Sequence, residues 1–209
     1  AMLLSDDPDT RFKGRLGPRK RVAWAEPLDL HEVKGLSRVL GCTVNDVLIA
    51  TITGALRHYL VSRGDDVDGL EIRATVPVNL RPLEHARELG NHFGLVFLPL
   101  PVGEENPLAR VYRVHQFMNE LKSSKQAAVA FSLLAALGMG PARFQRPMLE
   151  MMSRKATTVL TNVPGPRQPL YLAGSEVGEL MFWVPQSGSI GMGISILSYN
   201  QKVYCGLMT

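Results

Sequence analysis

The stretch Thr43-Val44-Asn45-Asp46-Val47-Leu48-Ile49-Ala50 opens a long apolar pattern of helical period. Thr43 is a favourable N-cap and Asp46 follows three residues later, so the two side chains predict a reciprocal capping box at a helix start. The Asp46 carboxylate also favours the positive end of the helix dipole. Capping does not explain Asn45, which is a mediocre helix former at the second helical position. This asparagine is therefore the first candidate functional residue.

Hydrophobic periodicity on either side of this stretch predicts the remaining elements. Helices are expected over 28–40, 44–62, about 107–121 and 142–153, with a strongly apolar segment at 127–137. Strands are expected over 22–25, 70–80, 93–101, 157–163, 170–173, 180–184, 192–199 and 203–208, with a tight hairpin turn at Asn200-Gln201. Pro77 predicts an edge or a bulge near the end of its strand. The pattern favours an α/β (α+β layered) fold, with helices packed on a mixed, largely antiparallel sheet.

The N-terminal segment is basic and rich in turn residues, within a chain of 209 residues whose formal net charge is +4. Its cations are Arg11, Lys13, Arg15, Arg19, Lys20 and Arg21. We interpret residues 1–21 as an extended linker from a missing N-terminal portion, and 22–209 as the domain. A basic cluster also suits nucleic acid, anionic lipid or a phosphorylated cofactor. Nucleic acid is disfavoured because neither interleaved aromatic residues nor a nucleic-acid motif accompanies the cluster.

The residue types that carry chemistry form no complete catalytic constellation. Cys42 and Cys205 make no disulfide framework, which favours a reducing compartment, and they lack companions at metal-ligand spacing. The histidines are His31, His58, His85, His92 and His115, and none has a carboxylate at helical or strand spacing that indicates a general base. The N-terminus lacks the apolar run of a signal peptide, and no stretch reaches the roughly 18 apolar residues of a membrane span. We expect no metal site.

Six stretches together resemble the C-terminal half of the bacterial wax ester synthase/acyl-CoA:diacylglycerol acyltransferase family. They are Gly17-Pro18-Arg19-Lys20-Arg21-Val22-Ala23-Trp24, Thr43-Val44-Asn45-Asp46-Val47, Val76-Pro77-Val78-Asn79-Leu80-Arg81, Leu89-Gly90-Asn91, Thr161-Asn162-Val163-Pro164-Gly165-Pro166 and Leu170-Tyr171-Leu172-Ala173-Gly174. Their order and spacing match across nearly the whole chain. The wider group resembles the chloramphenicol acetyltransferase and condensation-domain superfamily, in which two similar α/β halves form a tunnel.

The resemblance implies one half of a two-half, CoA-dependent O-acyltransferase. The family's general-base histidine lies in a His-His-x-x-x-Asp-Gly motif of the N-terminal half, which this chain lacks. Long-chain acyl-CoA is then the co-substrate with no bound cofactor, and a fatty alcohol or diacylglycerol is the acceptor for wax ester or triacylglycerol. The implied location is cytoplasmic, at the periphery of a membrane or lipid inclusion. The alternative is a non-catalytic lipid-surface or droplet-binding module that uses the basic segment and the apolar residues 127–152.

Carried over residue by residue, the resemblance also implies a set of site residues. Asn45 and Asp46 match the family's Asn-Asp motif and are expected to support the active site by fixing the helix start that faces the tunnel. Capping alone remains open, above all for Asp46. The expected substrate-binding residues are Arg81, Asn91, Thr161, Asn162 and Gly165. Arg81 would pair with a carboxylate or a CoA phosphate, or else cap a strand, and for Asn91 and Asn162 a turn-forming role remains open.

Overall fold

The computed structural model describes residues 5–14, 16–79, 93–124, 150–185 and 189–209, together with residues 129, 132 and 147. Its helices are α1 (Leu30–Val39), α2 (Val44–Ser62) and α3 (Pro107–Ser123). Its strands are β1 (Val22–Trp24), β2 (Leu28–Asp29), β3 (Ile72–Asn79), β4 (Phe93–Leu100), β5 (Thr158–Pro164), β6 (Tyr171–Leu172), β7 (Ser175–Glu176), β8 (Met192–Tyr199) and β9 (Lys202–Met208).

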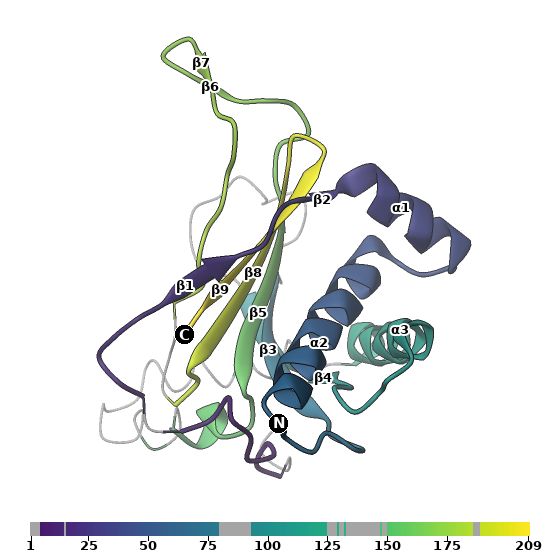
Figure 1. Cartoon of the computed structure of the whole chain (residues 1–209), viewed down its shortest axis with the longest axis vertical. Coiled ribbons are helices and arrows are strands. Elements are labelled where there is room, and N and C mark those ends of the chain that lie inside the picture. The colour runs from purple at the N-terminus through teal and green to yellow at the C-terminus, as the bar shows by residue number, and fades with distance from the viewer. Residues whose placement is uncertain are drawn as a thin grey trace.

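Seven of the strands form one mixed sheet in the order β1-β9-β8-β5-β3-β4, with β2 also paired to β9. The β1–β9, β2–β9, β3–β4 and β8–β9 pairs are antiparallel, while β5 is parallel to both β3 and β8. The three helices lie on one side of the sheet (Figure 1). The predicted layered α/β architecture with a mixed, largely antiparallel sheet is therefore confirmed.

Helix α2 contributes more buried residues to the domain than α1 or α3 does. It begins and ends at the predicted residues, and its capping box is present: Asp46 N donates to Thr43 Oγ1 at 3.2 Å and Thr43 N donates to Asp46 Oδ2 at 2.8 Å. Its inner side, including Ile49 and Leu60, is almost completely buried. Because nineteen residues present one apolar side to the sheet, packing stabilises this helix more than propensity does.

The end of the chain follows the predicted run of strands, except that one predicted strand is shorter and another is not formed. The tight turn between β8 and β9 is present, and Asn200 and Gln201 both have the positive φ that such a turn requires. The strand predicted at 170–173 shortens to β6, which pairs with β7 in a small hairpin that projects from the body of the domain (Figure 1). The strongly apolar segment 127–137 lies outside the described residues except for residues 129 and 132, and the helix predicted at 142–153 is described only at residues 147 and 150–153.

The prediction of a strand at 180–184 is wrong. Residues 180–185 have no regular structure and run beside β8 without joining the sheet. Ser195 of β8 donates its hydroxyl to the Phe182 carbonyl, and a Cβ added at Gly193 would come within 2.6 Å of the Val184 carbonyl oxygen. The continuous apolar run at 180–184 that suggested a strand therefore reflects a segment that packs against the sheet.

Residues 5–14 lie against the domain and are held there by a buried carboxylate. The side chain of Asp7 is fully buried and accepts hydrogen bonds from Arg73 N at 3.0 Å and from the Thr157 hydroxyl. Burial raises the pKa of the Asp7 carboxyl above its ordinary value, although the two hydrogen bonds oppose that rise. The interpretation of residues 1–21 as a linker stays a prediction, but its described first part is anchored to the domain.

Candidate functional site

A groove opens in the sheet where β3 and β5 separate. The two strands pair at only two positions, Ala74 with Thr158 and Thr75 with Val159, whereas β3 pairs with β4 along its whole length. Pro77 follows two residues later and has no N–H to donate toward β5, so the ladder does not continue there. The edge character predicted for this part of β3 is thus confirmed on its β5 side, and the separation leaves a groove beneath the start of α2.

The groove is mostly apolar and has a volume of about 470 Å³. Its apolar lining consists of Leu30, Val44, Leu48, Ile49, Val76, Pro77, Val78, Met118, Leu160, Pro164, Ile196 and Val203. Its polar side chains are Asn45, Asn79, Asn162 and Ser198. An apolar cavity of about 300–1,000 Å³ with a few polar groups is typical of a site for a small organic ligand. The groove therefore suits a largely apolar ligand that carries one or two polar atoms.

The two predicted asparagines meet in this groove. Asn162 Nδ2 on β5 donates to Asn45 Oδ1 on α2 at 2.9 Å, and 117 residues of sequence separate the two side chains. In this arrangement Asn45 directs its amide nitrogen away from Asn162, and Asn162 keeps its carbonyl oxygen for another partner. The hydrogen bond explains why a mediocre helix former stands at the second position of α2. It fixes an amide donor and an amide acceptor at the groove wall.

Asp46 points away from the groove, toward α3. Its side chain is 0% exposed, and Oδ2 accepts from Thr43 N and also contacts His115 Nδ1 at 2.7 Å. The other ring nitrogen of His115, Nε2, lies 3.0 Å from Asn119 Nδ2. These partners indicate the tautomer with the proton on Nδ1, which donates to the carboxylate while Nε2 accepts from the amide. Through its contact with Asp46, His115 joins α2 to α3.

Sequence reasoning missed the pairing of Asp46 with His115. It found no carboxylate at helical or strand spacing from His115, but the carboxylate comes from a different helix 69 residues away. One signal was present: His115 adjoins the apolar stripe of Val111 and Val114, both buried in α3. A polar side chain beside a buried stripe requires a partner.

The Asp46 carboxylate also acts on Cys42. Burial is the main cause that raises the pKa of the Cys42 thiol, and the negative charge of Asp46 adds to that rise.

Of the four other predicted site residues, the structure describes Thr161 and Gly165, and neither lines the groove. Thr161 alternates with its neighbours Leu160 and Asn162, so it lies on the opposite side of β5 and does not line the groove. Gly165 follows β5 and donates its N–H to the Ser198 carbonyl at 2.9 Å. Arg81 and Asn91 lie outside the described residues. The substrate-binding roles of these four residues stay predictions.

Gly165 has a clear structural role that a substitution tests. A Cβ at this position would overlap the Ser198 carbonyl oxygen of β8, so Gly165→Ala is expected to force β5 and β8 apart and to lower the free energy of unfolding by about 1–3 kcal/mol. Chemical denaturation measures this loss. Gly178→Ala is the matched control because nothing lies within 4 Å of its added Cβ. Equal effects of the two substitutions would contradict the close approach at Gly165.

Among the residues that the structure describes, no group of three or more His, Cys, Asp or Glu side chains is placed to hold a metal ion. In the same part of the chain no single helix has the length and apolarity to cross a bilayer. Helices α1 and α2 meet those criteria only as a pair, with a bend of 103° between them.

Comparison with known proteins gives the same picture from sequence and from structure. Residues 89–209 match the family model described as WS/DGAT C-terminal domain. A Mycobacterium bovis protein named as a diacylglycerol O-acyltransferase is 31% identical over 201 residues, which span 94% of this chain and 43% of that protein. The chain thus spans less than half the length of this curated relative.

Two solved structures share the fold. The wax ester synthase/diacylglycerol acyltransferase from Marinobacter aquaeolei VT8 superposes with a TM-score of 0.71 at 24% identity, over 97% of this chain and 46% of that one. The first condensation domain of the CDA synthetase gives a TM-score of 0.53 at 16% identity, over 94% and 40% of the two chains. The predicted relationship of the fold to acyltransferases and condensation domains is confirmed.

Proposed function

The chain belongs to the WS/DGAT C-terminal domain family, and we propose that it forms the C-terminal half of an acyl-CoA-dependent O-acyltransferase. In this proposal an N-terminal half carries the general-base histidine, and the two halves enclose the substrates between them. The products are wax esters, triacylglycerol or both, made from long-chain acyl-CoA and a fatty alcohol or diacylglycerol. The names of the relatives support this class of reaction.

The observation that carries the proposal is the hydrogen bond from Asn162 to Asn45 at the wall of an apolar groove. The acyl group of acyl-CoA and a fatty alcohol are apolar except at the reacting thioester and hydroxyl groups, and this groove offers amide groups against an apolar lining. Neither amide is basic enough to deprotonate an alcohol. The described lining therefore has the means to orient reacting oxygen atoms and needs a base from elsewhere, which accords with a histidine on the other half.

Asp46 and His115 have a supporting role in this proposal. The pair fixes the first turn of α2 against α3, and that turn also carries Asn45. Asp46 Oδ1 is buried and has no hydrogen-bond partner among the described residues, so it is an acceptor placed one residue from the groove wall.

The remaining site residues and the location follow from the family alone. Arg81, Asn91, Thr161 and Gly165 are proposed to act at the substrate-binding edge, with acyl-CoA as a substrate and no bound cofactor. A peripheral position at a membrane or lipid inclusion would bring the enzyme to its apolar acceptor. The exposed β6–β7 hairpin, in which Leu172 is 75% exposed, is a surface that such a contact would use.

A two-part assay tests the proposed function. The chain alone is expected to form no wax ester or triacylglycerol from palmitoyl-CoA with hexadecanol or dipalmitoylglycerol, because the base is missing. Co-expression with a polypeptide that carries the N-terminal half and its paired-histidine motif is expected to give turnover, measured as radiolabelled product. Turnover by the chain alone would refute the proposal that the general base lies on the N-terminal half. If the two-part mixture stays inactive and the chain alone floats with lipid vesicles in a flotation assay, the lipid-surface module would be favoured instead.

A further inference from the structure

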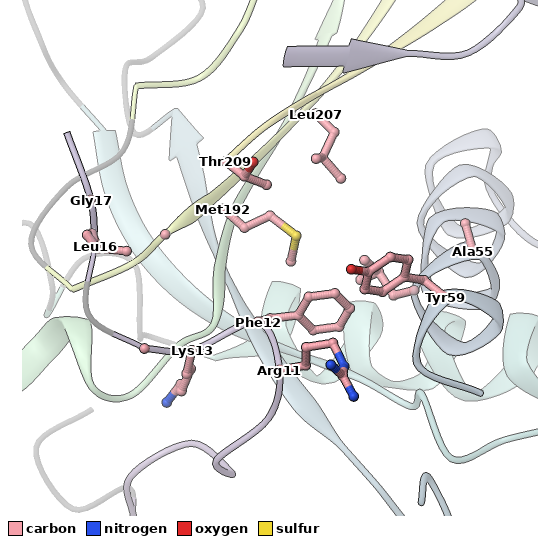
Figure 2. Close-up of a pocket in the computed structure, with 13 residues that line it drawn as sticks. Arg11, Phe12, Lys13, Leu16, Gly17, Ala55, Tyr59, Met192, Leu207 and Thr209 are labelled. Carbon is pink, nitrogen blue, oxygen red and sulfur yellow. The ribbon is translucent and has the colours of Figure 1, made fainter. Parts of the chain in front are cut away.

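A second cavity, of about 540 Å³, lies beside the other end of α2. Figure 2 shows Phe12 of the N-terminal segment lying between Tyr59 of α2 and Met192 of β8, with Leu207 of β9 and Ala55 of α2 around the same space. Phe12 and Tyr59 stack with their ring centroids 5.7 Å apart. The interior of this cavity is therefore mostly apolar and partly aromatic.

This cavity is separate from the groove at Asn45. The groove is lined on α2 by Leu48, whereas the second cavity is lined by Leu56, about 12 Å further along the helix at 1.5 Å per residue. On β8, Ile196 lines the groove and Met192 lines the second cavity. Ile194 lies between them and is only 3% exposed, so core side chains fill the space between the two sites.

The N-terminal segment forms one wall of the cavity and is held there by an ion pair, hydrogen bonds and close packing. Arg11 makes a two-pronged ion pair with Asp65, at 2.7 Å for each hydrogen bond, and Lys13 Nζ donates to the Arg154 carbonyl at 3.0 Å. Leu16 approaches the sheet so closely that a Cβ at Gly191 would lie 2.6 Å from its side chain. Together with the buried Asp7, these contacts hold Phe12 and Leu16 in place over the sheet.

Positive charge flanks one side of the cavity. Gly17 and Thr209 both line it, and Arg21 pairs with Thr209 through two backbone hydrogen bonds of 2.8 and 2.9 Å. Arg19, Lys20 and Arg21 thus begin two residues after the lining residue Gly17, and the last of them pairs with the lining residue Thr209. An apolar interior next to a cluster of cations is complementary to a single alkyl chain with an anionic end.

We propose that this cavity binds a long-chain fatty acid, with its alkyl chain beside Phe12, Tyr59 and Met192 and its carboxylate toward Arg19–Arg21. The site does not depend on the proposed acyl transfer, since it lies apart from the groove. Each additional buried CH₂ group is expected to tighten binding about fourfold until the cavity is full. Affinity is therefore expected to depend on chain length and on the charge of the head group.

Calorimetric titration of the chain with myristate, below its micellar concentration, tests the site. Myristate is expected to bind with one-to-one stoichiometry, at least about 100-fold tighter than hexanoate, and tighter than myristyltrimethylammonium, which has the same alkyl chain and the opposite charge. Ala55→Trp is expected to weaken myristate binding at least about tenfold, because the indole fills the space from an exposed helix position. Val61→Trp is the matched control: it is 50% exposed on the same helix and does not line the cavity.

Circular dichroism checks that both tryptophan variants keep the fold. Unchanged myristate binding in folded Ala55→Trp, or equal binding of hexanoate, would overturn the proposal. Tighter binding of myristoyl-CoA than of myristate would overturn the assignment to a free fatty acid. Loss of myristate binding in the two-part complex, with retention in the chain alone, would show that the N-terminal half is the occupant. Acyl transfer is measured in its own assay, so a failure of the chain to bind myristate would not affect the test of the proposed function.

Discussion

Replacing Asp46 with alanine is expected to lower the free energy of unfolding by about 2–4 kcal/mol. The substitution removes the acceptor for Thr43 N at the start of α2 and the acceptor for the buried Nδ1–H of His115. It therefore costs a helix cap and leaves a donor unsatisfied between two helices. Thermal unfolding should show a midpoint about 5–15 °C lower, at about 2–4 °C per kcal/mol for a domain of this size.

Two comparisons isolate the contribution of His115. Asp29 also caps a helix, accepting from His31 N and Glu32 N, but it is exposed. Asp29→Ala is therefore expected to cost only about 1 kcal/mol. Thr43→Ala removes the other half of the capping box and is expected to cost a similar amount. Equal losses for Asp46→Ala and Asp29→Ala would mean that the contact with His115 contributes nothing to stability.

In contrast to Asp46→Ala, Asn45→Ala is expected to have a large effect on turnover and a small effect on stability. The substitution removes the amide that the hydrogen bond to Asn162 holds at the groove wall, and a misplaced reacting group costs about 100-fold in rate. Stability is expected to change by less than about 1 kcal/mol, because the lost hydrogen bond is partly offset by the higher helix propensity of alanine. Steady-state kinetics of the two-part enzyme measures the first effect and denaturation the second.

Gln116→Ala is the matched control for the loss of an amide from a helix. Gln116 donates to Glu120 on the exposed side of α3 and does not line the groove. Its substitution is expected to leave kcat unchanged within a factor of two or three, as for an exposed side chain outside the site. If Asn45→Ala behaves like Gln116→Ala, the amide at the groove wall has no role in the reaction.

The features that the sequence predicted best are those encoded by neighbouring residues. The capping box of α2 depends on two side chains three residues apart, and the turn at Asn200-Gln201 depends on two adjacent residues that tolerate positive φ. Both are present where the pattern places them. The strand prediction at 180–184 was wrong because a segment that packs on a sheet and a strand within it can carry the same continuous run of apolar residues.

The site required contacts that no local spacing encodes. Asn45 meets Asn162 across 117 residues, and Asp46 meets His115 across 69, so neither pair was available from periodicity. The family resemblance did single out Asn45, Asp46 and Asn162, but it gave the two adjacent residues one shared role. The helix geometry separates them, because consecutive side chains point about 100° apart, one toward the groove and one toward α3.

A double-substitution cycle on Asn45 and Asn162 tests the central claim most directly, namely that their hydrogen-bonded pair acts as one unit in acyl transfer. The measurement is kcat of the two-part enzyme for Asn45→Ala, Asn162→Ala and the double variant. If the pair acts as one unit, the double variant loses no more rate than the more impaired single variant. Rate losses that multiply, or a kcat that neither substitution changes, would contradict the claim.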